Sequence, residues 1–409
     1  MTHHDVIVLG AGAAGLMCAL TAGRRGRRVL LLDHAAEAGA KILISGGGRC
    51  NFTNTNTAPD RFLSENPHFC RSALNRYTPE HFIALVRHHA IPFHEKTLGQ
   101  LFCDGSARAI VAMLLAECEA AGVDFRLSHT VTELSRADSF RIDTNNGSFS
   151  TDSLVLATGG LSIPKLGATG FAHDAARRFG LRVTETRPGL VPLTFGDDLL
   201  ALMRPLAGVS LDTEIHHGRH RFREAALFTH RGMSGPAILQ ISSYWKCGPI
   251  VLNLLPDHDA AAFLLDRKRT RPKAGLHTVL AEVLPRRLAD ALATGALATG
   301  TPGAGMAASP SIPDIRPETR MADLPDRHLR ALATRLSAWT ITPAGTEGHA
   351  KAEVTTGGID TRGLSSRTME AATVPGLFVI GEAVDVTGWL GGYNFQWAWA
   401  SGHCAGEAA

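Results

Sequence analysis

The stretch DVIVLGAGAAGLMCALTAGRRGRRVLLLDH, residues 5–34, decides the fold. Its first apolar run, VIVL, is typical of a strand buried on both faces of a parallel sheet. Gly10, Gly12 and Gly15 follow with GxGxxG spacing, small residues then predict a helix, and VLLL predicts a second strand. This order of strand, glycine turn, helix and strand predicts a Rossmann-like unit within an α/β fold.

The glycines have separate roles in such a unit. Gly10 makes the tight turn, Gly12 lets the backbone approach a pyrophosphate, and Gly15 lets the helix pack on the sheet. The helix start, with Ala13 and Ala14, offers N–H groups and partial positive charge to phosphates. The turn therefore predicts dinucleotide binding.

An acid closes the second strand. Asp33 is placed to accept hydrogen bonds from the adenosine ribose, and His34 adjoins it. An acid at this position disfavours a 2′-phosphate, because two negative groups would face each other. This stretch alone leaves NAD and FAD open.

Composition limits the other possibilities. The 409 residues suggest two or three domains, and 41 basic against 38 acidic residues give a net charge of +3 without a long basic run. Nucleic acid is therefore an unlikely partner, and a small-molecule substrate is expected. The uncharged residues 6–23 are broken by glycines, which favours a buried segment over a membrane span. Seven scattered cysteines without a CxxC pair fit a reducing cytoplasm, and no metal site is expected.

The segment KILISGGGRCNFTN, residues 41–54, favours FAD over NAD. It follows a short polar loop where an NAD domain usually continues into further strand–helix units, so it fits a longer ligand. We expect the three glycines, which have no side chain, to let the cofactor approach the backbone, and the polar side chains to bond it. The arginine would either neutralise the pyrophosphate or hold an anionic substrate. The candidates are Lys41, Ser45, Gly46, Gly47, Gly48, Arg49, Cys50 and Asn51.

Two distant segments support a flavin site. SLVLATGG, residues 153–160, predicts a buried strand that ends in Ala157, Thr158 and Gly159. GLFVIGEAVD, residues 376–385, predicts a late strand that ends in Gly381 and Glu382 and returns to the first sheet. Both bring backbone close to a ligand at a strand end.

These strands resemble those of the two-dinucleotide-fold flavoproteins. GGGRCNFTN, LFTHRGMSGPAILQIS (227–242) and GGYNFQWAWASG (391–402) resemble more closely the HI-type conserved flavoproteins, a family related to a bile-acid enone reductase and often labelled aminoacetone oxidase. The resemblance covers almost the whole chain and implies FAD, with Glu382 on the ribityl chain and Val131 near adenine. One departure is GQLFC at residues 99–103, where such proteins commonly have GRVFP.

The segment GWLGGYNFQWAWASG predicts a loop that opens the last helix. N–H groups there, at Gly391, Gly392, Tyr393 and Asn394, would stabilise negative charge on the reduced flavin. Tyr393 either lines the flavin or fills the core.

The remaining pattern predicts a discontinuous flavin domain with insertions. We predict FAD-binding segments at 1–188 and 351–409, a β-barrel-like domain at 189–256 and 337–350, and a helical cap at 257–336 with a loop at 298–313. Helices are expected over 79–89 and 106–121, and Asn146-Gly147 predicts a hairpin turn.

The sequence thus predicts an FAD-dependent oxidoreductase that exchanges a hydride between flavin N5 and a small organic substrate. No second GxGxxG occurs, so NADH or NADPH would visit the flavin transiently. The alternatives are an oxygen-using amine oxidase and a non-catalytic flavin-binding or RNA-associated module. The catalytic candidates are Arg49, His173, His230 and Tyr393.

Overall fold

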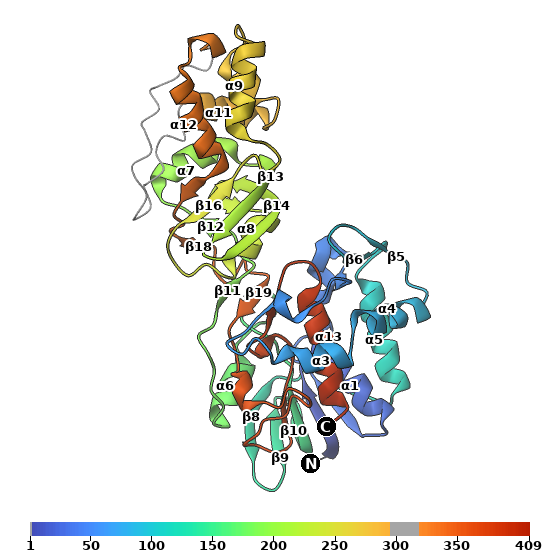
Figure 1. Ribbon diagram of the computed structural model, residues 1–409. Helices are drawn as coiled ribbons and strands as arrows, with labels where there is room; N and C mark the ends of the chain where they lie inside the picture. Colours follow the sequence, from blue (N-terminus) through green and yellow to red (C-terminus); the bar gives the residue numbers. More distant parts are fainter. Residues whose placement is uncertain (1, 295–318) are drawn as a thin grey trace. The chain divides into compact units, whose positions relative to one another are not determined.

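The computed structural model describes residues 2–294 and 319–409, which form two compact units (Figure 1). Unit 1 comprises Met1–Pro188 and Glu353–Ala409, and unit 2 comprises Gly189–Ala352. The loop predicted at 298–313 lies outside the described residues. The finer domain boundaries proposed from the sequence remain predictions.

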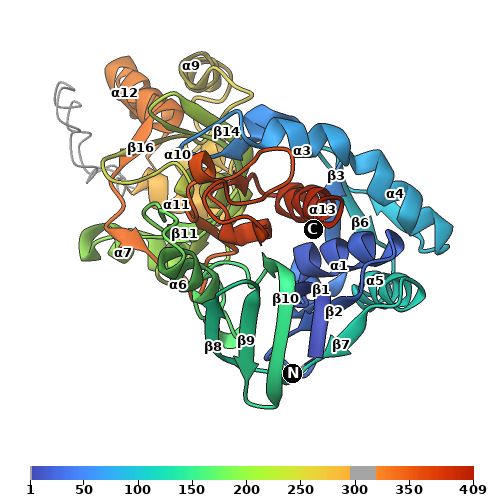
Figure 2. The same ribbon diagram turned by 90° about the horizontal axis from the view of Figure 1, so that it is seen from below.

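Unit 1 is built on a seven-stranded sheet, in which Figure 2 shows the order β7-β2-β1-β10-β9-β8. The seventh strand, β20, pairs with β10. β1 is parallel to β2 and β10, β7 is parallel to β2, and β20 is parallel to β10, whereas β8 and β9 are antiparallel. The strands are β1 (Thr2–Leu9), β2 (Val29–Leu32), β7 (Asp124–Arg126), β8 (Val131–Arg136), β9 (Phe140–Thr144), β10 (Gly147–Leu156) and β20 (Leu377–Val379).

The central strands form because their residues are apolar on both faces. Val6–Leu9 of β1 and all of β2 are buried, as the runs VIVL and VLLL predict. α1 (Ala13–Arg24) packs against α5 (Arg108–Ala120) and α13 (Tyr393–Gly406). Within the described parts of the chain, no helix has the length and apolar character needed to cross a membrane.

The late strand returns to the first sheet, as predicted. Leu377, Phe378 and Val379 of β20 lie opposite Leu154, Val155 and Leu156 of β10. The return brings the carboxyl ends of β1, β10 and β20 to one edge of the sheet. Loops that follow these ends therefore share one region of unit 1.

The hairpin turn is one residue earlier than predicted. Gly147 pairs with Thr144, so Asn145 and Asn146 form the turn and Gly147 begins β10. The Thr144 hydroxyl accepts from the Asn146 N–H at 3.1 Å and donates to the Gly147 carbonyl at 2.8 Å. These local bonds fix the register.

Shorter elements complete unit 1. β3 pairs with β6 and β6 with β5, while β4 pairs with β21. Helices α4 and α5 match those predicted over 79–89 and 106–121. The remaining elements are α2 (Ala40–Ile44), α3 (Cys70–Arg76), α4 (Pro79–His88), α6 (Phe171–Arg178), β3 (Asn51–Asn54), β4 (Phe62–Leu63), β5 (Phe93–Glu95), β6 (Gln100–Cys103), β19 (Val354–Thr356) and β21 (Thr387–Gly388).

Unit 2 contains an antiparallel sheet with the order β17-β16-β13-β14-β15-β12-β18, and α8 packs on β13 and β14. Its strands are β12 (Leu193–Thr194), β13 (Ser210–His217), β14 (His220–Thr229), β15 (Gly232–Ser234), β16 (Ile250–Asn253), β17 (Trp339–Ile341) and β18 (Gly345–Thr346), and β11 (Arg187–Gly189) precedes them. Its helices are α7 (Asp197–Met203), α8 (Pro236–Ser242), α9 (Ala260–Thr270), α10 (Leu276–Leu280), α11 (Arg286–Ala293) and α12 (Asp326–Ser337).

Candidate functional site

The turn between β1 and α1 has the geometry of a phosphate cradle. Gly12 is the N-cap of α1, and within the described residues no side chain caps this helix start and no acid lies in its first turn. A Cβ built on Gly12 would have no described heavy atom within 4 Å. The free N–H groups of the helix start therefore adjoin open space that suits an anion.

The other two glycines of the motif face protein instead. A Cβ on Gly10 would lie 2.5 Å from the Ala157 carbonyl oxygen, and one on Gly15 would lie 1.8 Å from the Gly10 carbonyl oxygen. Both glycines permit close packing of α1, β1 and β10. Ala14 is buried in α1 and Ala13 lies at its first position.

Asp33 is fixed beside this turn. One carboxylate oxygen accepts from the Ala11 N–H at 2.6 Å and the other from the Ala35 N–H at 2.8 Å. His34 Nδ1 lies 3.4 Å from the same carboxylate. Since each carboxylate oxygen has a further lone pair, Asp33 can still accept from a ribose hydroxyl.

A backbone hydrogen bond holds the start of β8, at Val131, near Asp33. The His129 N–H donates to the Asp33 carbonyl at 2.8 Å, and β8 begins two residues later at Val131. No sequence motif indicates this hydrogen bond of His129.

Lys41 and Glu382 form a half-buried ion pair. Lys41 Nζ bonds one Glu382 oxygen and donates to Ser162 Oγ at 2.7 Å. The other Glu382 oxygen accepts from Ser162 Oγ at 2.6 Å and from the Thr355 N–H at 2.9 Å. Burial opposes ionisation of Glu382, but the Lys41 charge and these hydrogen bonds outweigh it, so its pKa lies below the ordinary value.

Ser162 and Thr355 are members of this cluster that the sequence did not reveal. Thr355 Oγ1 accepts from the Leu161 N–H at 2.8 Å and from the Ser162 N–H at 3.2 Å. Both residues come from segments far from Lys41 in sequence, so no local motif could have indicated them. The loop after β10, strand β19 and the end of β20 bring them together.

The segment that follows β10 contains a hydroxyl group without a hydrogen-bond partner among the described residues. Among the described residues, Thr158 Oγ1 is buried without a hydrogen-bond partner. Gly159 has φ +75°, and a Cβ on it would have no described heavy atom within 4 Å. Ala157 is buried, and its N–H donates to the Leu9 carbonyl at 2.9 Å. A ligand oxygen at this strand end would satisfy Thr158.

The segment Ser45–Gly48 forms a 3-10 turn between α2 and β3. Gly46, Gly47 and Gly48 have φ of +56°, +67° and +84°. A Cβ on Gly46 would lie 2.8 Å from the Phe102 ring, whereas one on Gly47 would have no described neighbour within 4 Å. Only part of this platform therefore faces open space.

The polar residues around the platform are placed in different ways. Ser45 Oγ donates to the Ile42 carbonyl at 2.8 Å, so its proton is already used locally. Asn51 Nδ2 lies 3.2 Å from the Thr53 and Leu101 carbonyls when its amide is oriented to donate to them. Arg49 is exposed and makes no side-chain hydrogen bond or ion pair within the described residues.

Cys50 is a buried residue with φ +51°. Burial raises the pKa of its thiol to about 12, which keeps it protonated near neutral pH. Cys50 is therefore a small, buried side chain beside the platform residues, and its place among the cofactor-binding candidates remains a prediction.

The loop before α13 is held by Asn394. Its Oδ1 accepts from the Gly388 N–H at 2.8 Å and its Nδ2 donates to the Gly388 carbonyl at 2.9 Å. Gly392 is the N-cap with φ +94°, and a Cβ on it would lie 2.4 Å from the Thr53 carbonyl oxygen. Gly391 has φ +107° and packs on Gln100. Because these glycines have no side chain, the loop before α13 can approach β3 and β6 closely.

Near the end of β20, Gly381 connects two helices to the sheet edge. Its N–H donates to Ser401 Oγ at 3.0 Å, and Trp397 Nε1 donates to its carbonyl at 3.0 Å. Gly381 has φ +66°, and a Cβ on it would lie 2.9 Å from Ala14. α1 and α13 thus meet beside Glu382.

The catalytic candidates lie in different environments. His173, on α6 of unit 1, is 3% exposed, and within the described chain its Nε2 has no partner. Burial lowers its pKa, so it is neutral near pH 7. Tyr393 is 4% exposed and packs against Phe62, which places it in the core. His230 lies in the turn between β14 and β15 of unit 2.

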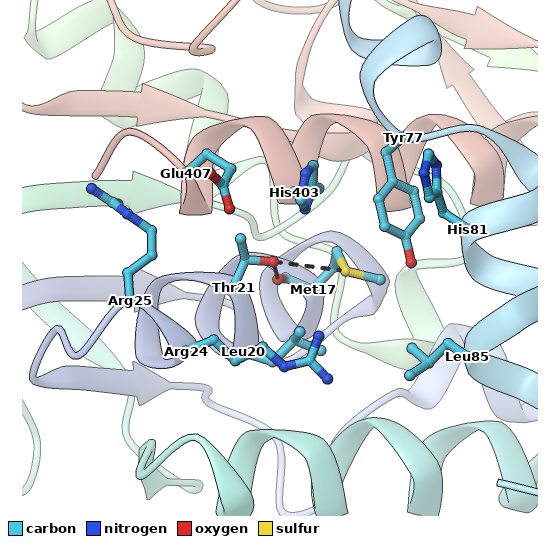
Figure 3. Close-up of a pocket in the computed structure, with 10 residues that line it drawn as sticks. All are labelled: Met17, Leu20, Thr21, Arg24, Arg25, Tyr77, His81, Leu85, His403 and Glu407. Carbon is cyan, nitrogen blue, oxygen red and sulfur yellow. Dashed lines mark hydrogen bonds between the residues drawn. The ribbon is translucent and has the colours of Figure 1, made fainter. Parts of the chain in front are cut away.

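A separate pocket of about 430 Å³ in unit 1 contains none of the predicted site residues (Figure 3). It lies against the last turns of α1 and α13, and Arg24, Tyr77 and His403 contribute to its wall. The last turn of a helix carries partial negative charge, which does not favour phosphate. The Gly12 end of α1 suits a phosphate better than this pocket does.

The parallel sheet, the uncapped glycine turn and the acid after β2 define a Rossmann-like dinucleotide-binding fold. Residues 4–408 match the model of the HI0933-like protein Rossmann domain, and the chain belongs to this family, so the protein is an FAD-dependent oxidoreductase. The resemblance found from the sequence motifs is confirmed.

Three relatives match along nearly their whole length. The chain is 50% identical over 98% of its length to the ribosomal RNA dihydrouridine synthase of Escherichia coli K12, covering 96% of it. It is 42% identical to the protein of the same name from Haemophilus influenzae, with 98% of each chain covered. It is 28% identical to the 3-dehydro-bile acid delta(4,6)-reductase of Clostridium scindens, again with 98% of each covered.

These relatives correct the prediction about partners. The names of the two more similar ones point to RNA, so the expectation of a small-molecule substrate with nucleic acid unlikely is wrong. The error has a physical reason: net charge averaged over the chain does not report how basic groups are distributed on its surface.

Proposed function

We propose that this protein is an FAD-dependent enzyme that reduces a uridine of ribosomal RNA to dihydrouridine. The observation that carries this proposal is the 50% identity to the Escherichia coli synthase over 98% of the chain. Reduction of uridine adds two hydrogens across the C5–C6 double bond. The product keeps its carbonyl groups and loses the planarity of the ring.

The bile-acid reductase supports the same class of chemistry. Its name describes reduction of double bonds in a 3-dehydro substrate, and in both substrates the double bond is conjugated to a carbonyl group. Hydride addition to such a bond places negative charge on the carbonyl oxygen. The common requirement is a hydride donor, a proton source and positive groups near that oxygen.

The residues of unit 1 fit FAD. The uncapped α1 start at Gly12 would hold the pyrophosphate, and Asp33 would accept from the adenosine ribose. Thr158 Oγ1 has an unused hydrogen-bonding capacity, and the Lys41–Glu382 pair would contact the ribityl region. Bound FAD would supply the hydride. The α13 N-terminus, which lacks a side-chain cap within the described chain, would stabilise negative charge on the ring.

The remaining parts of the reaction are proposed on chemical grounds. NADH or NADPH would reduce the flavin as a visiting donor, because the sequence has one GxGxxG turn. Arg49, exposed beside the platform, would contact a phosphate of RNA. His173 is neutral and buried, and its unpaired Nε2 would accept a hydrogen bond in this region. A cytoplasmic location fits a ribosomal RNA substrate.

The test uses ribosomal RNA from Escherichia coli cells that lack the relative. Purified protein, confirmed to hold FAD by absorption, is incubated with this RNA and NADH or NADPH, and nuclease digests are analysed by mass spectrometry. We expect one uridine to gain the mass of two hydrogen atoms. Heat-denatured protein and RNA from cells that have the relative serve as controls.

A small enone serves as the contrasting substrate, because the chain is 28% identical to the bile-acid reductase. The same preparation is offered a 3-keto-4-ene steroid with NADH or NADPH. Turnover of the steroid with unchanged RNA, or reduced flavin that reacts with neither substrate, would contradict the proposal.

A further inference from the structure

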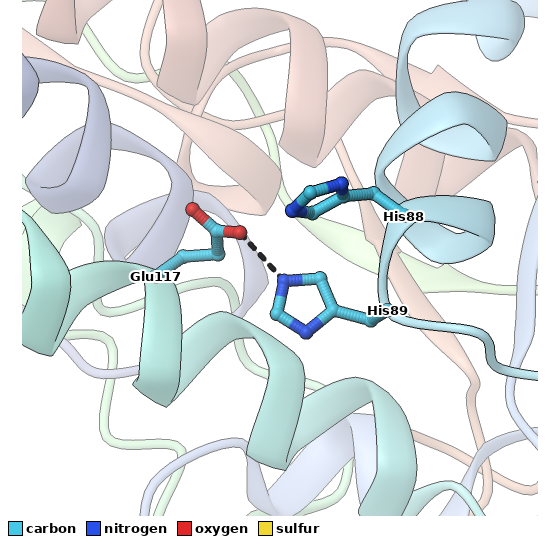
Figure 4. Close-up of side chains that lie close together, drawn as sticks. All are labelled: His88, His89 and Glu117. Atoms are coloured by element: carbon cyan, nitrogen blue, oxygen red, sulfur yellow. Dashed lines mark hydrogen bonds and ion pairs between the residues drawn. The ribbon is translucent and has the colours of Figure 1, made fainter.

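Three side chains on one side of unit 1 bring nitrogen and oxygen ligands together. His88 and His89 are at the end of α4, and Glu117 is in the last turns of α5 (Figure 4). One ligand atom of each lies within 4.8 Å of those of the other two. Among the described residues, no other group of three histidine, cysteine or acidic side chains has its ligand atoms this close together.

His88 and His89 are neighbours in sequence, and their position at the end of α4 allows both side chains to point toward α5. Neighbouring residues inside a helix diverge by about 100° around its axis. His89 is the C-cap of α4, with φ −84° and ψ 10°, and so departs from the helical path. Figure 4 shows both imidazoles extending toward Glu117.

The carboxylate of Glu117 is oriented from two sides. His89 Nε2 lies 2.6 Å from its Oε1, and Arg24 bonds its Oε2. The side chain of Glu117 is 13% exposed and that of His89 is 25% exposed. An oriented, largely buried carboxylate with one oxygen directed at imidazoles resembles the second-shell support that metal ligands receive in proteins.

We propose that His88, His89 and Glu117 bind a divalent transition-metal ion such as Zn²⁺. Two nitrogens and one carboxylate oxygen are a ligand set that Zn²⁺ accepts, with water in a fourth position. Ligand atoms around a tetrahedral zinc lie about 3.4 Å apart, given bonds of about 2.0–2.1 Å. The cluster reaches this spacing by small side-chain rotations, and Zn²⁺ replaces the direct contact between His89 and Glu117.

The ion would join α4 to α5. This site is distinct from the cofactor region, since its residues are not among those proposed to hold FAD. Hard cations such as Mg²⁺ prefer oxygen ligands, so we expect the site to select against them.

The test uses the tag-free, FAD-containing full-length protein after treatment with a chelator and gel filtration. Isothermal titration with ZnCl₂ should show one equivalent bound, and Co²⁺ should give a visible absorption band of tetrahedral type. His88→Ala should weaken Zn²⁺ binding about tenfold or more. His88 is exposed and touches the His89 ring edge to face, without a hydrogen bond to Glu117 among the described residues, so we expect this variant to keep the fold.

Matched variants complete the test. Glu117→Gln and His89→Ala should weaken binding similarly, whereas His94→Ala, which removes an exposed histidine paired with Asp104, should leave it unchanged. Zn²⁺ should raise the thermal midpoint of the wild type but not of His88→Ala. Binding that is absent from the wild type, or equal in wild type and His88→Ala, would overturn the proposal.

Discussion

Two glycine-rich turns of unit 1 look alike in sequence and differ in structure. In the β1–α1 turn, Gly10 and Gly15 would clash with backbone if they carried a Cβ, whereas Gly12 faces open space without a strained φ. In the platform, Gly46 packs on Phe102, and Gly47 faces open space with a left-handed φ. A glycine thus serves packing, conformation or ligand access, and each reason predicts a different mutant phenotype.

The largest effect is expected at Gly15. Gly15→Ala would place a methyl group 1.8 Å from the Gly10 carbonyl oxygen, and α1 would have to move from β1. We expect a loss of more than about 3 kcal/mol in the free energy of unfolding. Urea unfolding followed by circular dichroism measures it. A variant as stable as the wild type would show that the turn has more room than its backbone indicates.

Gly12→Val separates ligand access from packing. The site has no described neighbour within 4 Å and an ordinary φ of −84°, so we expect only about 1 kcal/mol of lost stability at this N-cap position. FAD retention should be abolished, because the side chain would occupy the pyrophosphate position. Absorption of the purified variant measures retained flavin. Full occupancy would refute the assignment of Gly12.

Glu382→Gln tests the ion pair that Glu382 forms with Lys41. It removes the charge partner of Lys41, so FAD binding should weaken less than in Gly12→Val. Because the Glu382 pKa is lowered on folding, its stabilising contribution is present above the ordinary value of 4.5 and is lost as pH falls through the folded value. Thermal midpoints of wild type and variant should therefore differ at pH 7 and converge in acid. A constant difference across this range would contradict the ion pair's role.

Gly47→Ala should have the smallest effect. Its φ of +67° costs an L-residue about 1 kcal/mol, but no described atom would be struck. Gly46→Ala, the matched control, adds contact with Phe102 and should cost a further 1–3 kcal/mol or so, about the range for overpacking. Thermal unfolding compares the two variants. Equal losses would mean that both Phe102 and the Asn51 backbone nitrogen, 2.9 Å from that Cβ, move aside.

The sequence predicted features that local chemistry determines. The apolar runs of β1 and β2, the glycine turn and Asp33 lie within thirty or so residues, and their spacing follows from the Rossmann-like geometry. The return of β20 was also predictable, because a short buried strand near the chain's end needs a sheet to join. Family membership followed from long, idiosyncratic motifs.

Features that depend on distant segments were not predictable. Ser162 and Thr355 reach Glu382 because the loop after β10, strand β19 and the end of β20 meet, and neither residue has a motif of its own. One local feature was also missed, because the sequence does not reveal that Ser45 Oγ donates to the Ile42 carbonyl. The RNA-directed chemistry of the relatives was missed because charge counts carry no spatial information.

The hydrogen bond from Trp397 to the Gly381 carbonyl gives the molecule an internal optical reporter. This indole is buried, and the carbonyl that it bonds belongs to the residue before Glu382. Trp399 lies two residues further along α13, and its Nε1 donates to the Phe52 carbonyl at 2.8 Å. Oxidised flavin absorbs where tryptophan emits, so a flavin held beside α13 would quench these indoles by energy transfer. Emission would fall as the protein is loaded and recover when the flavin is released or bleached by a reductant, which allows each redox step to be followed without an added label.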